Sequence, residues 1–264
     1  DILRRLVRAI HTEPFVRMML AGDEVVPVPG AANVAGWHHR ISEYAYARSQ
    51  VVCWNHVYHL LGPIVQELRD TVAGIDWNAI QARENLASSV RNLMELHAQT
   101  IHIWGGVTKR HGYQDAWRVV KSAALGQVCN GAPMDSGWTK VASFATDGRE
   151  NAQTIWDSRV STSIIHRLDG LLVQDGNHPG AAAPAWGLQV VAGRGGTRPR
   201  SMQLLWRKRS CTWPVHFAGS AVVRRIVAIL NDPAENYPRM PLPDGTEKDW
   251  DMFGAGLVLF MDGY

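Results

Sequence analysis

Apolar residues recur at three- and four-residue intervals through most of this sequence, and only residues 188–191 show a convincing strand pattern. The clearest run is Val160, Ile164, Leu168 and Leu171, which would form one buried stripe along a helix. Asp157 stands just before that run, at the N-cap position. Further helices are expected within residues 1–12, 37–73, 76–100, 216–230 and 247–264. The sequence therefore predicts a mostly α-helical protein.

One lysine and one aspartate stand out at the junction of two predicted helices. Residues 139–142 read Thr-Lys-Val-Ala and begin a short apolar helix with a single lysine, Lys140. A polar loop over residues 147–153 follows, and Asp157 then opens the next helix, seventeen positions after the lysine. A lysine near the start of one helix and a carboxylate at the start of the next can face a common cleft.

The segment from Gly137 to Val160 resembles the catalytic core of the helix-hairpin-helix DNA glycosylases, especially the 8-oxoguanine and endonuclease III branches. In that family a lysine directly after the hairpin is followed, at about this spacing, by an aspartate that opens a helix. The resemblance implies that Lys140 is the nucleophile and Asp157 the catalytic carboxylate. The family's hairpin usually reads Leu-Pro-Gly-x-Gly, whereas residues 134–138 of this chain read Met-Asp-Ser-Gly-Trp.

The resemblance also implies a fold, an activity and a partner. We expect two helical lobes around a cleft in a single unit of residues 1–264, with lobes at 37–130 and 131–264 and residues 1–36 packed across them. The implied protein is a DNA glycosylase of base excision and DNA repair, with an optional lysine Schiff-base lyase step. It would act on DNA as a monomer, without a cofactor, in the cytoplasm or on a bacterial nucleoid.

The chemistry of the N-glycosidic bond explains these two residue types. Breaking this bond builds positive charge on the sugar, which a carboxylate such as Asp157 would stabilise. A neutral lysine amine can instead form a Schiff base with the opened sugar. Because a lysine of pKa about 10.4 is a poor nucleophile at neutral pH, its pocket must desolvate it. Trp138 and Trp156 would supply an apolar setting for Lys140.

A base stacked in a duplex must be flipped into a pocket before it can be cleaved. The sequence holds 11 tryptophans against 5 phenylalanines, and Trp138 and Trp156 are our candidates for the walls of this base pocket. A large aromatic complement would suit a bulky modified base, such as those of viral DNA, and would connect the enzyme with antiviral defence.

Candidate DNA contacts come from the hairpin and from a basic stretch. The net charge of +3 permits nucleic-acid binding without arguing for it. No acidic residue occurs between Asp175 and Asp232, an interval that is rich in arginine and begins with a glycine-rich segment. Arginines there could follow the phosphate backbone. The candidate contacts are Gly137, Thr139, Arg159, Arg194, Arg198 and Arg200.

Simpler interpretations stay open. Asp157 can be only a helix N-cap, and Lys140 one more surface lysine. The chain can be a non-catalytic DNA-binding protein on the same scaffold, which the altered hairpin favours, and it would then bind DNA without releasing a base. It can also be an unrelated all-α enzyme with a tryptophan-lined pocket for a small molecule, which would not bind DNA at low salt.

Cysteine use and hydropathy point to a soluble protein of a reducing compartment. The 3 cysteines, Cys53, Cys129 and Cys211, are odd in number and far apart, which favours free thiols. His56 and His59 follow Cys53 at helical spacing, but no fourth ligand is evident, so no metal site is expected. No stretch reaches the uninterrupted apolar length of a membrane-spanning helix, and the start does not resemble a signal peptide.

Overall fold

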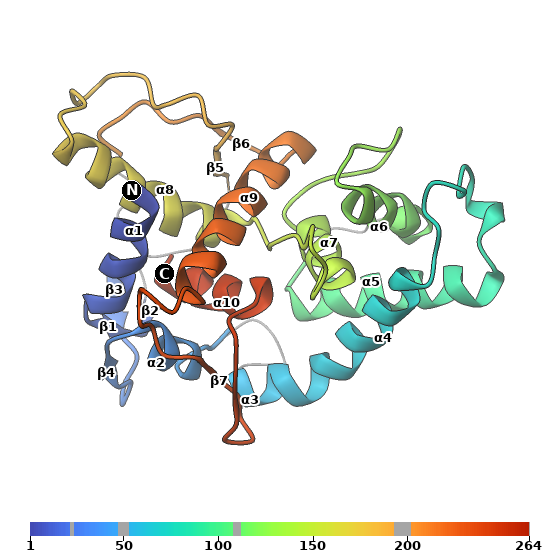
Figure 1. Cartoon of the computed structure of the whole chain (residues 1–264), viewed down its shortest axis with the longest axis horizontal. Coiled ribbons are helices and arrows are strands. Elements are labelled where there is room, and N and C mark those ends of the chain that lie inside the picture. The colour runs from blue at the N-terminus through green and yellow to red at the C-terminus, as the bar shows by residue number, and fades with distance from the viewer. Residues whose placement is uncertain (22–23, 47–52, 108–111, 193–201, 264) are drawn as a thin grey trace.

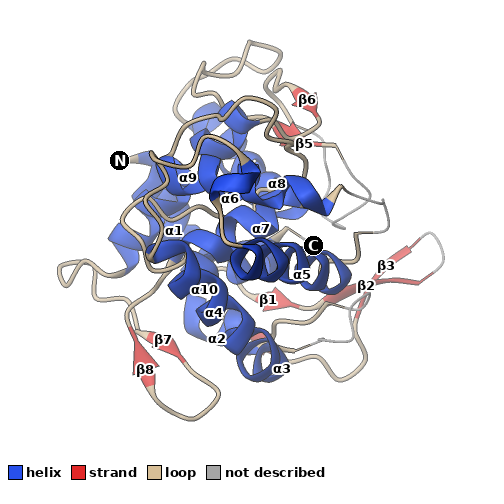
Figure 2. Ribbon diagram, turned by 90° about the vertical axis from the view of Figure 1, so that its right-hand side faces the viewer, coloured by secondary structure: helices blue, strands red, loops and turns tan. Residues whose placement is uncertain are grey.

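The computed structural model describes residues 1–21, 24–46, 53–107, 112–192 and 202–263, and it is mostly helical, as predicted (Figures 1 and 2). The helices are α1 (Ile2–Thr12), α2 (Trp37–Ser42), α3 (Trp54–His56), α4 (Gly62–Ala73), α5 (Ser88–Trp104), α6 (Ala116–Leu125), α7 (Trp138–Thr146), α8 (Ser158–Gln174), α9 (Trp213–Leu230) and α10 (Met252–Asp262). A π-helical turn (Val57–Leu61) joins α3 to α4, and short 3₁₀ turns lie at Arg83–Asn85 and Tyr113–Asp115.

The strands are short and form pairs, and Figure 2 shows β2 with β3, β5 with β6, and β7 with β8 at the edges of the helical body. Three pairs are antiparallel, and the fourth, β5 with β6, is parallel. Their bounds are β1 (Phe15–Val16) with β4 (Asn33–Val34), β2 (Met18–Ala21) with β3 (Glu24–Pro27), β5 (Val190–Val191) with β6 (Lys208–Arg209), and β7 (Met240–Pro241) with β8 (Glu247–Lys248). The strand expected at residues 188–191 is thus confirmed in its second half as β5.

The helices gather into two groups, which Figure 1 shows side by side. In one group α10 packs against α2, α8 and α9, and α1 lies on α8 and α9. In the other group α7 is the centre and packs against α4, α5 and α6. Every residue of α7 is buried. The two groups touch where α7 meets α10.

The two helix groups do not follow the boundary at residues 130 and 131 that separates the expected lobes 37–130 and 131–264. α2 belongs with α10 rather than with α4, and α7 belongs with α4–α6 rather than with α8. Helix α1, at the N-terminus of the chain, packs on α8 and α9, which belong to one helix group. The chain therefore starts in one lobe, builds the other from α3 to α7, and returns.

Two of the expected helical regions differ in detail. Two helical segments parted near Gly62 and Pro63 were expected within residues 37–73. Instead α2 ends at Ser42, and the helical run from Trp54 continues through the π-helical turn and Pro63 into α4. α10 is not broken by its glycines. A Cβ at Gly254 would lie 2.0 Å from Met240 Sδ, so this glycine allows the β7 strand to approach the helix.

α9 combines a core position with an apolar composition. Within the part of the chain that the structure describes, it is the one helix long and apolar enough to cross a membrane by length and composition. Half of that window, 50%, is buried inside the protein, where α9 packs on α1 and α10. A core helix of a soluble protein has the same properties, and the fold is compatible with a soluble protein.

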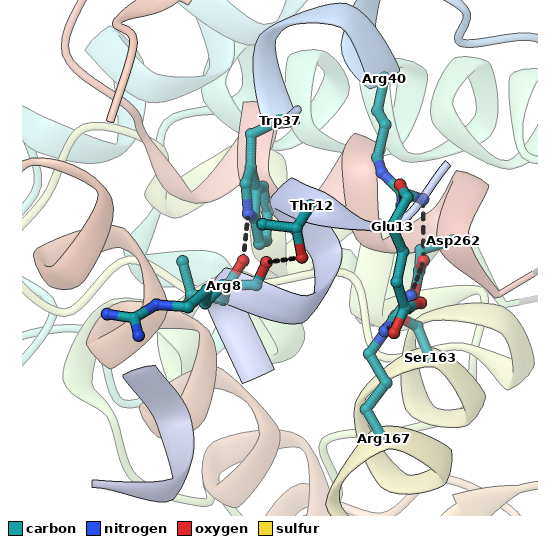
Figure 3. A network of polar contacts seen from close by, with 9 residues as sticks. Arg8, Thr12, Glu13, Trp37, Arg40, Ser163, Arg167 and Asp262 are labelled. Atoms are coloured by element: carbon teal, nitrogen blue, oxygen red, sulfur yellow. Dashed lines mark hydrogen bonds and ion pairs between the residues drawn. The ribbon is translucent and has the colours of Figure 1, made fainter. Parts of the chain in front are cut away.

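A buried network of charges ties α2, α8 and α10 together (Figure 3). Asp262, which has no exposed surface, accepts hydrogen bonds on Oδ1 from Arg40 Nη1 (3.0 Å) and Arg167 Nη2 (2.7 Å). Its Oδ2 accepts from Arg167 Nε (2.8 Å) and Ser163 Oγ (2.6 Å). Arg167 Nη1 also reaches Glu13 Oε2 at 2.8 Å. Each carboxylate oxygen of Asp262 therefore accepts two hydrogen bonds from the chain.

Candidate active site

The turn before α7 is capped by its own aspartate. Residues 126–137 connect α6 to α7, and these two helices pack against each other. Asp135 Oδ1 accepts the backbone N–H of Gly137 (2.8 Å) and of Trp138 (3.1 Å). An aspartate that accepts the first free amides of a helix stabilises its N-terminus. The amides that a hairpin of the expected type would offer to a DNA phosphate are therefore already engaged at Gly137 and Trp138.

Lys140 extends from the first turn of α7 into the junction between the two helix groups. Its side chain is nearly buried, at 9% exposure, and Nζ donates a hydrogen bond to Ser136 O at 3.1 Å. The methylene chain passes directly over Gly105, at the end of α5. A Cβ at Gly105 would lie 2.6 Å from Lys140 Cδ, so the glycine leaves the space that the lysine occupies. The surface-lysine interpretation of Lys140 is therefore wrong.

Asp157 caps α8 and faces the lysine at the same time. Its Oδ1 accepts the backbone N–H of Arg159 (2.9 Å) and Val160 (3.1 Å), as the N-cap prediction requires. Its Oδ2 lies 3.7 Å from Lys140 Nζ, within ion-pair distance but beyond hydrogen-bond distance. Because the cap uses one carboxylate oxygen, the other is directed to Lys140. The two interpretations of Asp157, cap and functional carboxylate, are compatible.

The pair lies across the junction of the two helix groups. Lys140 belongs to α7, and Asp157 is the residue directly before α8. The two are seventeen positions apart in the sequence, and the structure brings their side chains together. The residues between them cross from one group to the other and run along α9, where Thr154 N donates to Ser220 Oγ (3.1 Å). The position of Asp157 is thus fixed by the core of one group and that of Lys140 by the core of the other.

A narrow aromatic pocket lies beside the pair. It has room for about one water molecule. Four aromatic residues from three distant parts of the chain contribute to its wall, with Lys140 and Asp157 as the ionisable groups. The pocket is lined by Tyr44, Tyr46, Trp104, Gly105, Lys140, Ile155, Asp157, Gly256, Leu257 and Phe260. A nucleobase would enter only if this wall opened.

Trp138 and Trp156, the predicted walls of the base pocket, are buried in the core. Trp138 packs in the core against His102, with ring centroids 4.8 Å apart. Trp156 has no exposed surface and lies against Gly219 of α9, where a Cβ would be 2.2 Å from the indole ring. Neither tryptophan lines the pocket at Lys140. Both hold the backbone on either side of the catalytic candidates instead.

Tyr46 and Phe260 were missed in the sequence, and they also position Arg159. The Arg159 guanidinium carbon lies 4.4 Å from the centre of the Phe260 ring and 5.2 Å from that of Tyr46. Tyr46 OH donates to Gly105 O at 3.1 Å. Arg159 is thus held at the edge of the pocket by cation–π contacts. A sequence signal for these aromatic residues is lacking, because no motif or period joins Tyr46 to Phe260.

The remaining predicted DNA contacts have different outcomes. Thr139 has no exposed surface, and its hydroxyl donates to Ser136 O at 2.9 Å, so it caps the turn and is not accessible to DNA in this conformation. Arg194, Arg198 and Arg200 lie outside the described residues.

Cys211, which the sequence did not single out as functional, lies close to the pair. Burial raises the pKa of its thiol to about 12, and the negative charges of Asp135 and Asp157 act in the same direction. The thiol is therefore protonated at neutral pH and a weak nucleophile. Cys211 directly precedes the N-cap of α9, so the start of this helix also borders the site.

No metal centre is formed by the residues that the structure describes, since no three His, Cys, Asp or Glu side chains gather at one place among them. The arrangement offers instead an amine, a carboxylate and aromatic surface in a nearly dry setting. That combination can stabilise a developing cation and form a covalent bond to an electrophilic carbon.

Comparisons with protein-family models, curated proteins and solved structures found no match to this chain.

Proposed function

We propose that this protein is a DNA N-glycosylase of the helix-hairpin-helix kind, which removes a damaged or modified base. The observation that carries the proposal is the buried Lys140–Asp157 pair, 3.7 Å apart, beside a pocket with aromatic walls. The residues that resemble the family's nucleophile and carboxylate thus meet in space. The packed pair α6 and α7, joined by the turn that precedes Lys140, supports the same assignment.

Asp157 would act on the sugar. As the bond between C1′ and the base nitrogen breaks, positive charge grows on C1′ and the ring oxygen, and the bonding electrons leave with the base. Asp157 Oδ2, the oxygen that does not accept the α8 amides, is available to stabilise that charge. The departing base must gain a proton, which water or the attacking group can supply.

Lys140 would supply the attacking group in a bifunctional enzyme. Its neutral amine forms a bond to C1′, loses a proton, and yields a Schiff base after the sugar ring opens. Elimination then nicks the strand and leaves the amine free after hydrolysis. The carbonyl of Ser136, 3.1 Å from Nζ, orients the amine toward the carboxylate. A water molecule in place of the amine gives simple hydrolysis through Asp157 alone.

The residues that line the pocket indicate which bases the enzyme would accept. Tyr44, Tyr46, Trp104 and Phe260 offer ring faces and edges on which a flipped base can stack. The wall must move apart to admit any base, and a bulky modified base would require the larger opening. We therefore place such bases, together with 8-oxoguanine, among the substrates to be tested. The proposed enzyme acts on DNA as a monomer in the cytoplasm or on the nucleoid.

Base release from a panel of modified DNA duplexes tests this proposal. We expect release by the wild type, and a loss of about 10²- to 10⁴-fold in single-turnover rate for Asp157→Asn. Asparagine is also a good N-cap, so α8 should remain folded. Asp175→Asn, at the other end of α8, is the matched control, because it removes only an exposed contact with Arg5.

Three results would contradict the proposal in different ways. DNA binding without release from any substrate would favour a non-catalytic DNA-binding protein. The absence of DNA binding at low salt would favour an all-α enzyme for a small molecule. Equal loss of release in Asp157→Asn and Asp175→Asn would mean that damage to α8, rather than loss of a catalytic carboxylate, explains the effect.

A further inference from the structure

We propose that the exposed basic triplet Arg207, Lys208 and Arg209 is the surface that holds DNA phosphates beside the active site. This inference rests on the proposed glycosylase function and assigns its DNA contacts to β6 and the residue before it. The triplet is the longest run of consecutive lysine and arginine residues in the chain. All three residues are exposed.

The triplet is held rigidly on α8. Asp169, a buried residue of α8, accepts hydrogen bonds from the backbone N–H groups of Gln203 (2.7 Å) and Leu204 (2.8 Å). It also accepts the indole N–H of Trp206 at 2.9 Å. One buried carboxylate thus fixes the residues that lead into the triplet. The charges that follow are presented from a defined backbone, which lowers the entropy cost of binding a phosphate.

The triplet is also connected with the start of α8 through hydrogen bonds. β6 pairs with β5 through Val190 N to Arg207 O and Ala192 N to Arg209 O, both 3.0 Å. β5 in turn is fixed to the first turn of α8, because Val191 N donates to Ser161 Oγ (3.0 Å) and Ser161 N donates to Asp157 O (3.0 Å). Neighbouring strands lie about 4.8 Å apart. Two hydrogen-bonded steps, from β6 to β5 and from β5 to Ser161, therefore connect the basic strand with the first turn of α8, which Asp157 caps.

The other end of the triplet leads back to the same site. Cys211, two residues after Arg209, is near enough to Asp157 and Lys140 for their charges to act on its thiol. The indole N–H of Trp213 then binds Ala132 O at 3.1 Å, in the turn between α6 and α7. The segment from the triplet to α9 thus runs along the site, from the first turn of α8 to the turn before Lys140.

The charges of the triplet are not neutralised locally. The chain has no acidic residue between Asp175 and Asp232, and among the described residues none of the three side chains forms an ion pair. By contrast, the amides of Gly137 and Trp138 are already bound by Asp135. A DNA phosphate near the pair would therefore find free cations on β6 more readily than free amides at the hairpin. Exposed, unpaired cations beside a candidate active site favour a polyanion as the partner.

The test measures duplex binding in the Asp157→Asn background, so that cleavage does not interfere. The variant Arg207→Gln/Lys208→Gln/Arg209→Gln should bind at least about tenfold more weakly than its parent at low salt. It should also reduce the slope of log affinity against log salt by about 2 to 3, since each phosphate contact contributes about 0.9. Replacing both arginines of the triplet by lysine should restore most of the binding.

The matched control removes three exposed charges elsewhere, with Arg8→Gln/Arg225→Gln/Arg239→Gln. These residues lie on α1, on the second half of α9 and before β7, and none belongs to β6. Its binding should stay within about twofold of the parent and its salt slope nearly unchanged. If both triple variants lose binding equally, net charge rather than the triplet holds DNA, and this inference is wrong while the glycosylase proposal stands. If the parent does not bind DNA at low salt, the proposed function fails first.

Discussion

Two aspartates of this protein are almost equally buried, and their surroundings differ. Asp262 accepts four hydrogen bonds, two on each oxygen, from Arg40, Arg167 and Ser163. Asp157 accepts two backbone hydrogen bonds on Oδ1, while its Oδ2 faces Lys140 Nζ at 3.7 Å beside a pocket. Both oxygens of the Asp262 carboxylate are thus occupied by hydrogen-bond donors of the chain. The Asp157 carboxylate keeps one oxygen directed to the amine of Lys140.

The difference predicts a structural role for Asp262 and, under the proposed function, a catalytic role for Asp157. A buried charge whose bonds are all satisfied holds elements together and has little capacity to bind anything else. A buried amine and carboxylate that lie near each other, but are not hydrogen-bonded, can both rearrange around a substrate. Fold stability should therefore depend on Asp262, and activity on Lys140 and Asp157. The predictions below test this separation.

The largest expected effect on stability comes from Asp262→Ala. It would leave Arg40 and Arg167 buried without their main partner, and the free energy of unfolding should fall by about 3–5 kcal/mol. Ser163→Ala removes one neutral donor to the same carboxylate and should cost only about 1 kcal/mol. Denaturant unfolding measures both changes.

Base release per folded molecule should be unaffected in Ser163→Ala, which is expected to remain fully folded. A stability loss in Asp157→Asn as large as that in Asp262→Ala would contradict the separation. So would a Ser163→Ala protein of normal stability that had lost base release.

A smaller, pH-dependent effect is expected at Asp147, a third carboxylate at the end of α7. Burial, aided by the charge of Asp251, raises the pKa of Asp147 from 3.8 to about 6. Its Oδ1 has no hydrogen-bond donor among the described residues. Because the folded state holds this proton more tightly, its stabilising contribution is complete below pH 3.8 and is lost as the pH rises through about 6.

Asp147→Asn should therefore stabilise the protein on the order of 2 kcal/mol at pH 8 and change little at pH 4. Denaturant unfolding of both proteins between these pH values would give the difference curve. If the free energies of unfolding of the two proteins stay a constant amount apart across this pH range, burial of a carboxylate that lacks hydrogen-bond donors is not costly here. The contrast between Asp147 and Asp262 would then lose its physical basis.

The sequence predicted the helices whose apolar stripes are local and complete. The helices expected at residues 1–12 and 216–230 correspond to α1 and α9, and the stripe after Asp157 forms α8. The N-cap role of Asp157 was also predictable, because capping depends on the next three residues. Fold class and the meeting of Lys140 with Asp157 both followed from such local features.

The grouping of the helices and the wall of the pocket were not predictable in the same way. α7 packs against α4–α6 and is buried on all sides, so periodicity does not specify its neighbours. The abundance of tryptophan suggested Trp138 and Trp156 as pocket walls, but composition does not specify the direction of a side chain. Tyr46 and Phe260, which do line the pocket, are more than two hundred positions apart. Long-range packing decides these features.

The most direct test of the central claim is borohydride trapping of a protein–DNA Schiff base with the duplexes from which base is released. The account predicts a covalent complex with the wild type and with Asp175→Asn, and none with Lys140→Gln. Asp157→Asn should trap far more slowly, because the base must leave before the amine can attack C1′ productively. A covalent complex that persists in Lys140→Gln at the wild-type rate would contradict the assignment of Lys140 as the nucleophile.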